Sequence, residues 1–232
     1  MKATRSPVTD RSSTRLVYSV AVVGFAAFVV ISVLVQARFL VGADLAAAQA
    51  KQALISRPLD LWSTVVGIAI SGEFSVVYGV IAVVLLWRAG LGRWSVAPRA
   101  FVVLVPVEIA MKILVPQPAV PYEFYRGAFY PLTDVTLQGT FPSGHAIRAA
   151  YLCAFAAILL AARRGFVGRL APIILGLLAA LMSLSRVYMG YHWLSDVVAG
   201  MILGAALALI VAPPVAARLS PVRPDDSPPD RV

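Results

Sequence analysis

Long apolar stretches alternate with short, charge-rich segments along most of the chain. A helix that crosses a membrane needs about 20 predominantly apolar residues in succession. By this measure the pattern predicts six membrane-spanning helices, with a polar, proline- and tyrosine-rich loop at 117–141. The six predicted helices cover residues 16–36, 71–87, 100–116, 145–162, 170–186 and 193–212.

Two parts of this pattern allow more than one interpretation. The first apolar stretch follows four basic residues, as in a secretory signal, but it is long and lacks a clean small-residue cleavage site. We therefore favour a retained first helix. Apolar residues also run from 61 to 87 with an interruption at 71–73, which fits two short spans or one span preceded by a surface segment. We favour one span at 71–87, with residues 43–68 at the outer surface.

Composition supports the membrane class. Of the 232 residues, 60% are hydrophobic and only 13% are charged, and the mean hydropathy is +0.84. Soluble domains are nearer half apolar and a quarter charged. We therefore predict an all-α, polytopic membrane protein with a six-helix bundle at 16–212. Residues 1–15 are predicted as a cytoplasmic tail, and 213–232 as a disordered, proline-rich cytoplasmic tail.

The formal net charge of +9 does not require a nucleic acid partner. Basic residues of membrane proteins gather in cytoplasmic loops. Thirteen of the 20 lysines and arginines lie in four segments that the predicted helix order places on one side, at 1–15, 88–99, 163–169 and 218–231. We therefore expect both termini in the cytoplasm and membrane lipids as partners. The sequence leaves the oligomeric state open.

Helix order brings several ionisable side chains to one depth near the outer surface. The fourth and fifth predicted helices hold about 17 residues each and so span roughly 26 Å. His145 at the start of the fourth, Arg186 at the end of the fifth and the following His192 share that depth. Lys112, near the end of the third, reaches it as well. Because ionisable residues at membrane depth are rare and usually functional, this cluster predicts an outward-facing phosphate site.

The start of the fourth predicted helix strengthens this prediction. Ser143, Gly144 and His145 place free backbone N–H groups and the positive end of the helix dipole beside the cations. Glycine also allows close approach of a ligand to the backbone. We expect Lys112, Ser143, Gly144 and Arg186 to bind the phosphate.

Two histidines and an aspartate fit phosphoryl transfer. His192 can attack phosphorus as a neutral imidazole, and Asp196, four residues later on the same helical face, can orient it. His145 can protonate the leaving alcohol and then activate water. Since the chain has only two histidines and one cysteine, we expect no metal and no cofactor.

The spacing of these residues resembles that of a known family. Residues 142–145 read Pro-Ser-Gly-His and 185–196 read Ser-Arg-x5-His-x3-Asp. They match the second and third motifs of the type 2 phosphatidic acid phosphatase superfamily, which includes the soluble vanadium haloperoxidases. The resemblance covers roughly 60–212 and implies a six-helix membrane core with metal-independent phosphatase or phosphotransferase activity on lipid phosphates. It also implies that His192 is the nucleophile and His145 the acid.

The first motif of that family, Lys-x6-Arg-Pro, is incomplete here. Lys112 is present, but Gln117 and Ala119 occupy the positions where arginines are expected. This departure removes one phosphate-binding cation and puts full activity or the substrate class in doubt. We predict that Arg148 or Arg126 supplies the missing cation.

Glu108 offers two of these cations another partner. It lies one turn before Lys112 on the same predicted helix and is opposite in charge to the intramembrane Arg148. The sequence leaves open whether each cation binds phosphate or Glu108.

The resulting hypothesis is an integral membrane lipid phosphate phosphatase that works through a phosphohistidine. Its candidate substrates are undecaprenyl diphosphate, phosphatidic acid and phosphatidylglycerophosphate. A second hypothesis is a lipid phosphotransferase, in which an alcohol takes the place of water. A third is a non-catalytic lipid-binding or transport protein with a degenerate site, which only the incomplete first motif supports.

Overall fold

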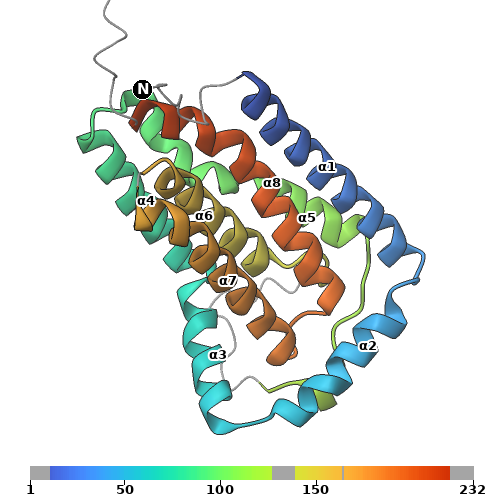
Figure 1. Ribbon diagram of the computed structural model, residues 1–232. Coiled ribbons are helices and arrows are strands. Elements are labelled where there is room, and N and C mark those ends of the chain that lie inside the picture. The colour runs from blue at the N-terminus through green and yellow to red at the C-terminus, as the bar shows by residue number, and fades with distance from the viewer. Residues whose placement is uncertain (1–10, 127–138, 164, 220–232) are drawn as a thin grey trace, which may run out of the picture.

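Helices make up all the regular structure in the part of the chain that is described. The computed structural model describes residues 11–126, 139–163 and 165–219 (Figure 1). The predicted all-α class is confirmed. The α-helices are α1 (Arg11–Gln36), α2 (Val41–Ala50), α3 (Arg57–Ala69), α4 (Gly72–Arg88), α5 (Leu104–Leu114), α6 (Gly144–Ala161), α7 (Phe166–Tyr188) and α8 (Leu194–Leu219). The 3-10 helices are η1 (Lys51–Leu54), η2 (Gly92–Val103) and η3 (Tyr122–Phe124).

Helix α8 lies between α1 and α6 and packs along both (Figure 1). Two of its glycines bring it close to α6. A Cβ at Gly200 would lie 2.6 Å from the backbone oxygen of Ser143, and a Cβ at Gly204 would meet the backbone oxygen of Ile147. Small residues at such positions let two membrane helices approach closely. The beginnings of α6 and α8 therefore lie side by side.

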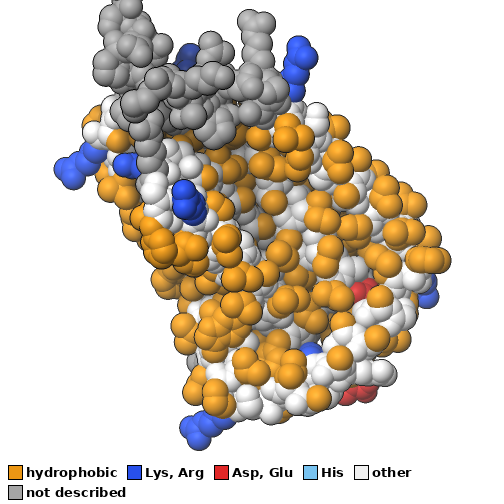
Figure 2. Space-filling model, in the orientation of Figure 1, with side chains coloured by type: hydrophobic (Ala, Val, Ile, Leu, Met, Phe, Trp, Pro, Cys, Tyr) orange, Lys and Arg blue, Asp and Glu red, His pale blue; other side chains and the backbone are white. Residues whose placement is uncertain are grey.

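The sides of the bundle are apolar. Val22 on α1, Leu85 on α4 and Leu177 on α7 expose 66%, 61% and 60% of their surface, and Figure 2 shows hydrophobic side chains over most of one face. Among the described residues, α1, α6, α7 and α8 are long and apolar enough to cross a membrane, and α3 with α4 adds a fifth span if counted together. The predicted multi-pass membrane class is confirmed, whereas six crossings remain a prediction.

The interrupted apolar stretch forms two helices. The predicted span at 71–87 corresponds to α4, whose N-cap Ser71 accepts a hydrogen bond from the Phe74 N–H at 3.5 Å. Helix α3 precedes it, and the two are bent by 56°. The segment 43–68, expected at the outer surface, forms most of α2, all of η1 and most of α3, and closes one end of the bundle (Figure 1).

The prediction of one α-helix at 100–116 is wrong in its first part. Residues 100–103 belong to the 3-10 helix η2, and the α-helix α5 begins only at Leu104. Proline has no N–H to donate and its ring clashes with the carbonyl four residues earlier, so it is tolerated mainly in the first turn of an α-helix. Pro106 lies in the first turn of α5, which fits a start of the α-helix at Leu104. With 11 residues, α5 is about 17 Å long, shorter than the roughly 30 Å of a hydrocarbon core.

The predicted end of the last helix at 212 is also wrong. Helix α8 continues through Pro213 and Pro214 to Leu219. The prolines remove two backbone donors, but Val215 is fully buried in an apolar cluster with residues of η2 and α6. Burial of this apolar face offsets the lost hydrogen bonds.

The two predicted tails are described only in part. Helix α1 begins at Arg11, inside the predicted tail 1–15. The remaining tail residues, 1–10 and 220–232, lie outside the described residues, as do 127–138 of the predicted loop.

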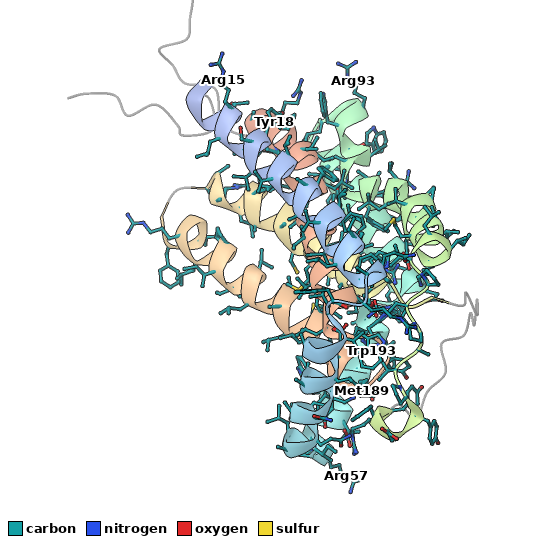
Figure 3. The ribbon with its side chains drawn as sticks, turned by 90° about the vertical axis from the view of Figure 1, so that its right-hand side faces the viewer. Arg15, Tyr18, Arg57, Arg93, Met189 and Trp193 are labelled. Carbon is teal, nitrogen blue, oxygen red and sulfur yellow. The ribbon has the colours of Figure 1, made fainter. Side chains whose placement is uncertain are left out.

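The bundle has two distinct ends. Arg15 and Arg93 lie at one end, whereas Met189, Trp193 and Arg57 lie toward the other (Figure 3). The second end carries the start of α6, the end of α7 and the start of α8, together with α2 and α3. The motif residues therefore gather at the end opposite Arg15 on α1 and Arg93 on η2.

Candidate active site

A backbone hydrogen bond joins the two motif segments. Ser143 is fully buried and caps α6, because its Oγ accepts a hydrogen bond from the Ala146 N–H at 3.4 Å. The Ser143 N–H donates to the backbone oxygen of Asp196 at 3.1 Å. The first turn of α6 is therefore held directly against the first turn of α8.

His192 and Asp196 form the pair that the sequence predicted. The His192 Nδ1 lies 3.2 Å from the Asp196 Oδ2, and the same oxygen accepts the Trp193 N–H at 3.0 Å. Asp196 is fully buried, whereas 12% of the His192 side chain is exposed. The carboxylate thus fixes one ring nitrogen and leaves Nε2 as the ring nitrogen that points away from it.

The guanidinium group of Arg186 lies against Gly67 of α3, where the absence of a side chain makes room for it. Its Nη2 donates to the Ser63 backbone oxygen at 3.0 Å, and a Cβ at Gly67 would lie 2.6 Å from its Cζ. The guanidinium also lies over the Tyr191 ring, with its Cζ 5.1 Å from the ring centroid. The backbone oxygen of Arg186 accepts hydrogen bonds from the N–H groups of Tyr191 and His192 at 3.1 and 3.4 Å. The Arg186 backbone therefore holds the turn that carries His192 next to the guanidinium group.

His145 lies among the predicted cations. It is within electrostatic reach of Lys112, Arg148, Arg186 and His192, and the Arg148 Nη2 lies 3.5 Å from its Nδ1. The structure thus brings together the residues that helix order placed at one depth. Among the described residues, no group of three or more histidine, cysteine, aspartate or glutamate side chains is arranged to hold a metal ion.

Glu108 contacts two of these cations. Its carboxylate lies 3.2 Å from the Lys112 Nζ and 3.9 Å from the Arg148 Nη1. Arg148 also donates from Nε to the backbone oxygen of Ile70 at 3.4 Å. A Cβ at Gly144 would meet the Glu108 carboxylate, so glycine at this position leaves room for an anionic group.

Arg126 has a partner away from this cluster. Its Nε and Nη2 donate to the two oxygens of Asp60 at 3.0 and 2.9 Å, a bidentate arrangement. The Tyr188 hydroxyl donates to the same carboxylate at 2.7 Å. The structure therefore places Arg148, rather than Arg126, beside His145.

Gln117, one of the two departures from the first motif, belongs to a buried network that the sequence did not predict. Its Nε2 donates to the Asp44 carboxylate at 3.1 Å and to the Ser195 Oγ at 3.2 Å. Asp44 is 4% exposed and accepts the N–H and Oγ–H of Ser195 at 2.8 and 2.7 Å. Burial raises the pKa of Asp44, against the hydrogen bonds from Ser195. The network ties α2 to the first turn of α8.

Lys51 is a second residue that the sequence did not single out. It is 6% exposed, and its ammonium group donates to the backbone oxygens of Phe124, Val187 and Tyr188. A cation suits the last carbonyls of a helix, where the dipole is negative. Lys51 thus joins η1, η3 and the end of α7, directly after Arg186.

Comparison with known proteins identifies the family of the chain. Residues 94–219, more than half of the chain, match the model of the PAP2 superfamily. The chain belongs to this superfamily. The matched region contains Lys112 and both motif segments, 142–145 and 185–196, and thus includes most of the candidate site residues.

Two comparisons of this PAP2 chain lead to Bacillus subtilis. The chain is 36% identical over 92 residues to phosphatidylglycerophosphatase B of strain 168, an alignment that covers 38% of this chain and 45% of that protein. The alignment thus spans less than half the length of the curated relative. The fold is similar to the crystal structure of a transmembrane PAP2 type phosphatidylglycerolphosphate phosphatase, with a TM-score of 0.65 and 23% identity, covering 82% of this chain and 93% of that one.

Proposed function

We propose that this protein is a membrane phosphatase that removes phosphate from lipids through a phosphohistidine on His192. The observation that carries the proposal is the pair of His192 and buried Asp196 at 3.2 Å, at the edge of a cation cluster that contains His145. Membership in the PAP2 superfamily supports it. A helix end that only stabilises the fold would not need two histidines and three cations at one depth in an apolar bundle.

The first chemical step follows from the orientation of His192. Asp196 accepts the Nδ1–H, which leaves the lone pair on Nε2 free to attack phosphorus. The P–N bond forms as the bond from phosphorus to the lipid oxygen breaks. The carboxylate then stabilises the positive charge on the imidazole of the phosphohistidine.

His145 handles the proton in both steps. A bound phosphate dianion offsets the positive charge of the surrounding cations and lets His145 hold a proton, which passes to the leaving lipid oxygen. In the second step His145 takes a proton from water, the water oxygen attacks phosphorus, and the P–N bond breaks. Orthophosphate and free His192 result.

Three side chains are assigned to the phosphate oxygens. Lys112, Arg148 and Arg186 lie around His145, and the start of α6 from Gly144 adds backbone N–H groups. Ser143 caps this turn, and its own N–H donates to Asp196. We assign Arg148 the role of the arginine missing from the first motif, since its guanidinium is beside His145. Arg126 stays a second candidate that its ion pair with Asp60 disfavours.

We propose phosphatidylglycerophosphate as the first substrate to test. The name of the Bacillus subtilis relative supports it, and undecaprenyl diphosphate and phosphatidic acid are the competing substrates. We further propose that both termini are cytoplasmic and that the site faces the outside. The position of Arg15 and Arg93 at the end opposite the motif residues supports this orientation.

The test is phosphate release from these three lipids by purified protein in detergent with EDTA. We expect activity that survives chelation and is lost in His192→Ala. Tyr122→Phe, an exposed change on η3, is the matched control and should keep wild-type activity. Loss of wild-type activity with EDTA would refute the metal-free reaction, and full activity of His192→Ala would refute the nucleophile. Formation of a new phosphoester without free phosphate would favour the phosphotransferase.

A further inference from the structure

Glu108 is an acidic side chain inside the cation cluster, and the reaction above gives it no role. Its two oxygens lie 3.2 Å from the Lys112 Nζ and 3.9 Å from the Arg148 Nη1, and only 17% of its side chain is exposed. One carboxylate therefore contacts both of the cations that, with Arg186, are assigned to phosphate.

The same carboxylate lies against the backbone at the start of α6. A Cβ at Gly144 would come 2.6 Å from the Glu108 Cδ and closer still to both carboxylate oxygens. This is the end of the helix at which N–H groups and the positive end of the dipole face outward. Carboxylate and phosphate are both anions with several acceptor oxygens, so the two suit the same surroundings.

Electrostatics explains why a carboxylate is needed beside Lys112 and Arg148. Two largely buried cations at this place repel each other and have lost much of their hydration when no anion is bound. Glu73, at the start of α4, is also within electrostatic reach of Arg148. Arg148 therefore keeps one acidic neighbour when the Glu108 carboxylate moves away.

We propose that Glu108 is an internal substitute for the substrate phosphate. Its carboxylate occupies the cation pocket before a substrate binds, and the phosphate of an incoming lipid displaces it from Lys112 and Arg148. The inference rests on the proposed function, because it concerns the same pocket. It also gives Glu108 a part in turnover: its return to the two cations after hydrolysis helps orthophosphate to leave.

Binding of inorganic phosphate to the full chain in detergent tests this proposal without any turnover. Glu108→Gln removes the charge and keeps the length of the side chain. We expect the dissociation constant for phosphate, from thermal-shift titration, to fall at least about fivefold, because a competing charge within a few ångströms is gone. Glu123→Gln on η3 is the matched control, since it removes the same charge from an exposed side chain. We expect it to leave the constant unchanged.

An unchanged or raised dissociation constant in Glu108→Gln would overturn the proposal, since the carboxylate would then merely hold the cations in place for phosphate. If that variant does not fold, Glu108→Asp serves instead, because the shorter side chain draws the charge back from Gly144. Glu108→Asp should also lower the dissociation constant for phosphate, and an unchanged constant would likewise overturn the proposal. Phosphate binding that depends on Glu108 in a protein without lipid phosphatase activity would refute the proposed function alone. Lipid phosphatase activity in a protein whose phosphate binding does not depend on Glu108 would refute only the role of Glu108.

Discussion

Gly67 on α3 leaves the space in which the guanidinium of Arg186 lies. In Gly67→Ala the new Cβ would come 2.6 Å from the Arg186 Cζ and 2.7 Å from its Nη1. The Cβ would come closer still to the Arg186 Nη2. Since atoms in contact are about 3.5 Å apart, one group must move by at least about 1 Å. The guanidinium is the far end of a flexible side chain, so we expect it to move while α3 stays folded.

The expected loss of activity can be estimated from the role assigned to Arg186. Displacement of a catalytic group by about 1 Å costs on the order of 100-fold, and removal of one donor to transition-state charge costs about 100- to 1,000-fold. We therefore expect kcat/KM to fall roughly 30- to 100-fold, or about 2 to 2.7 kcal/mol. Stability should change little, because alanine favours the helix by about 1 kcal/mol and offsets the weakened hydrogen bond from Arg186 to Ser63.

The assay is phosphate release from phosphatidylglycerophosphate in detergent, with the melting temperature measured on the same samples. Gly176→Ala is the matched control, because an added Cβ on this α7 glycine would meet no atom within 4 Å. In an Arg186→Met background, Gly67→Ala should cost less than about threefold, since no guanidinium remains to be displaced. An equal loss in both backgrounds, or full activity of Gly67→Ala alone, would refute the reasoning.

Two further predictions concern the end of α7 and the contact between α6 and α8. Burial lowers the pKa of Lys51 to about 8, and a neutral amine has only two N–H groups for its three carbonyl acceptors, so activity should fall as the pH rises through that value. Lys51→Met should be less active at neutral pH and should lack this alkaline decline in a pH profile of kcat; an identical profile would contradict the role of Lys51. In Gly204→Ala the Cβ would meet the backbone oxygen of Ile147, which cannot move without separating the helices. We expect a loss of about 2 kcal/mol, measured as a lower melting temperature than in wild type and in Gly176→Ala; an unchanged melting temperature would refute the close contact.

The gathering of the candidate site residues could be predicted because it depends only on helix order and helix length. Helix order sets the direction of each span, and rise per residue sets depth. These two alone bring Lys112, His145, Arg186 and His192 to one end, and the structure places them within electrostatic reach of one another. The pairing of His192 with Asp196 needs only the four-residue spacing that puts both on one helical face.

The supporting contacts could not be predicted in the same way. Lys51 binds backbone oxygens more than 70 residues away in sequence, and carbonyl groups are present at every residue, so the sequence does not identify the partners. Asp44 meets Ser195 across 151 positions. The sequence carries only a weaker signal for these contacts. Asp44 and Lys51 are charged residues in an alanine-rich segment between two apolar stretches. Such residues need partners when they are buried.

The incomplete first motif and the acidic residue in the pocket have connected consequences. Gln117 lies where the family has an arginine, but its amide donates to Asp44 and Ser195, so this position supports the start of α8. An arginine there would face the same carboxylate. The cations around His145 are then Lys112, Arg148 and Arg186, and Glu108 contacts the first two. Because Arg148 replaces the arginine of the first motif in the proposed site, Glu108 contacts two of the three cations assigned to phosphate. Its displacement is therefore a large part of substrate binding in the proposed mechanism.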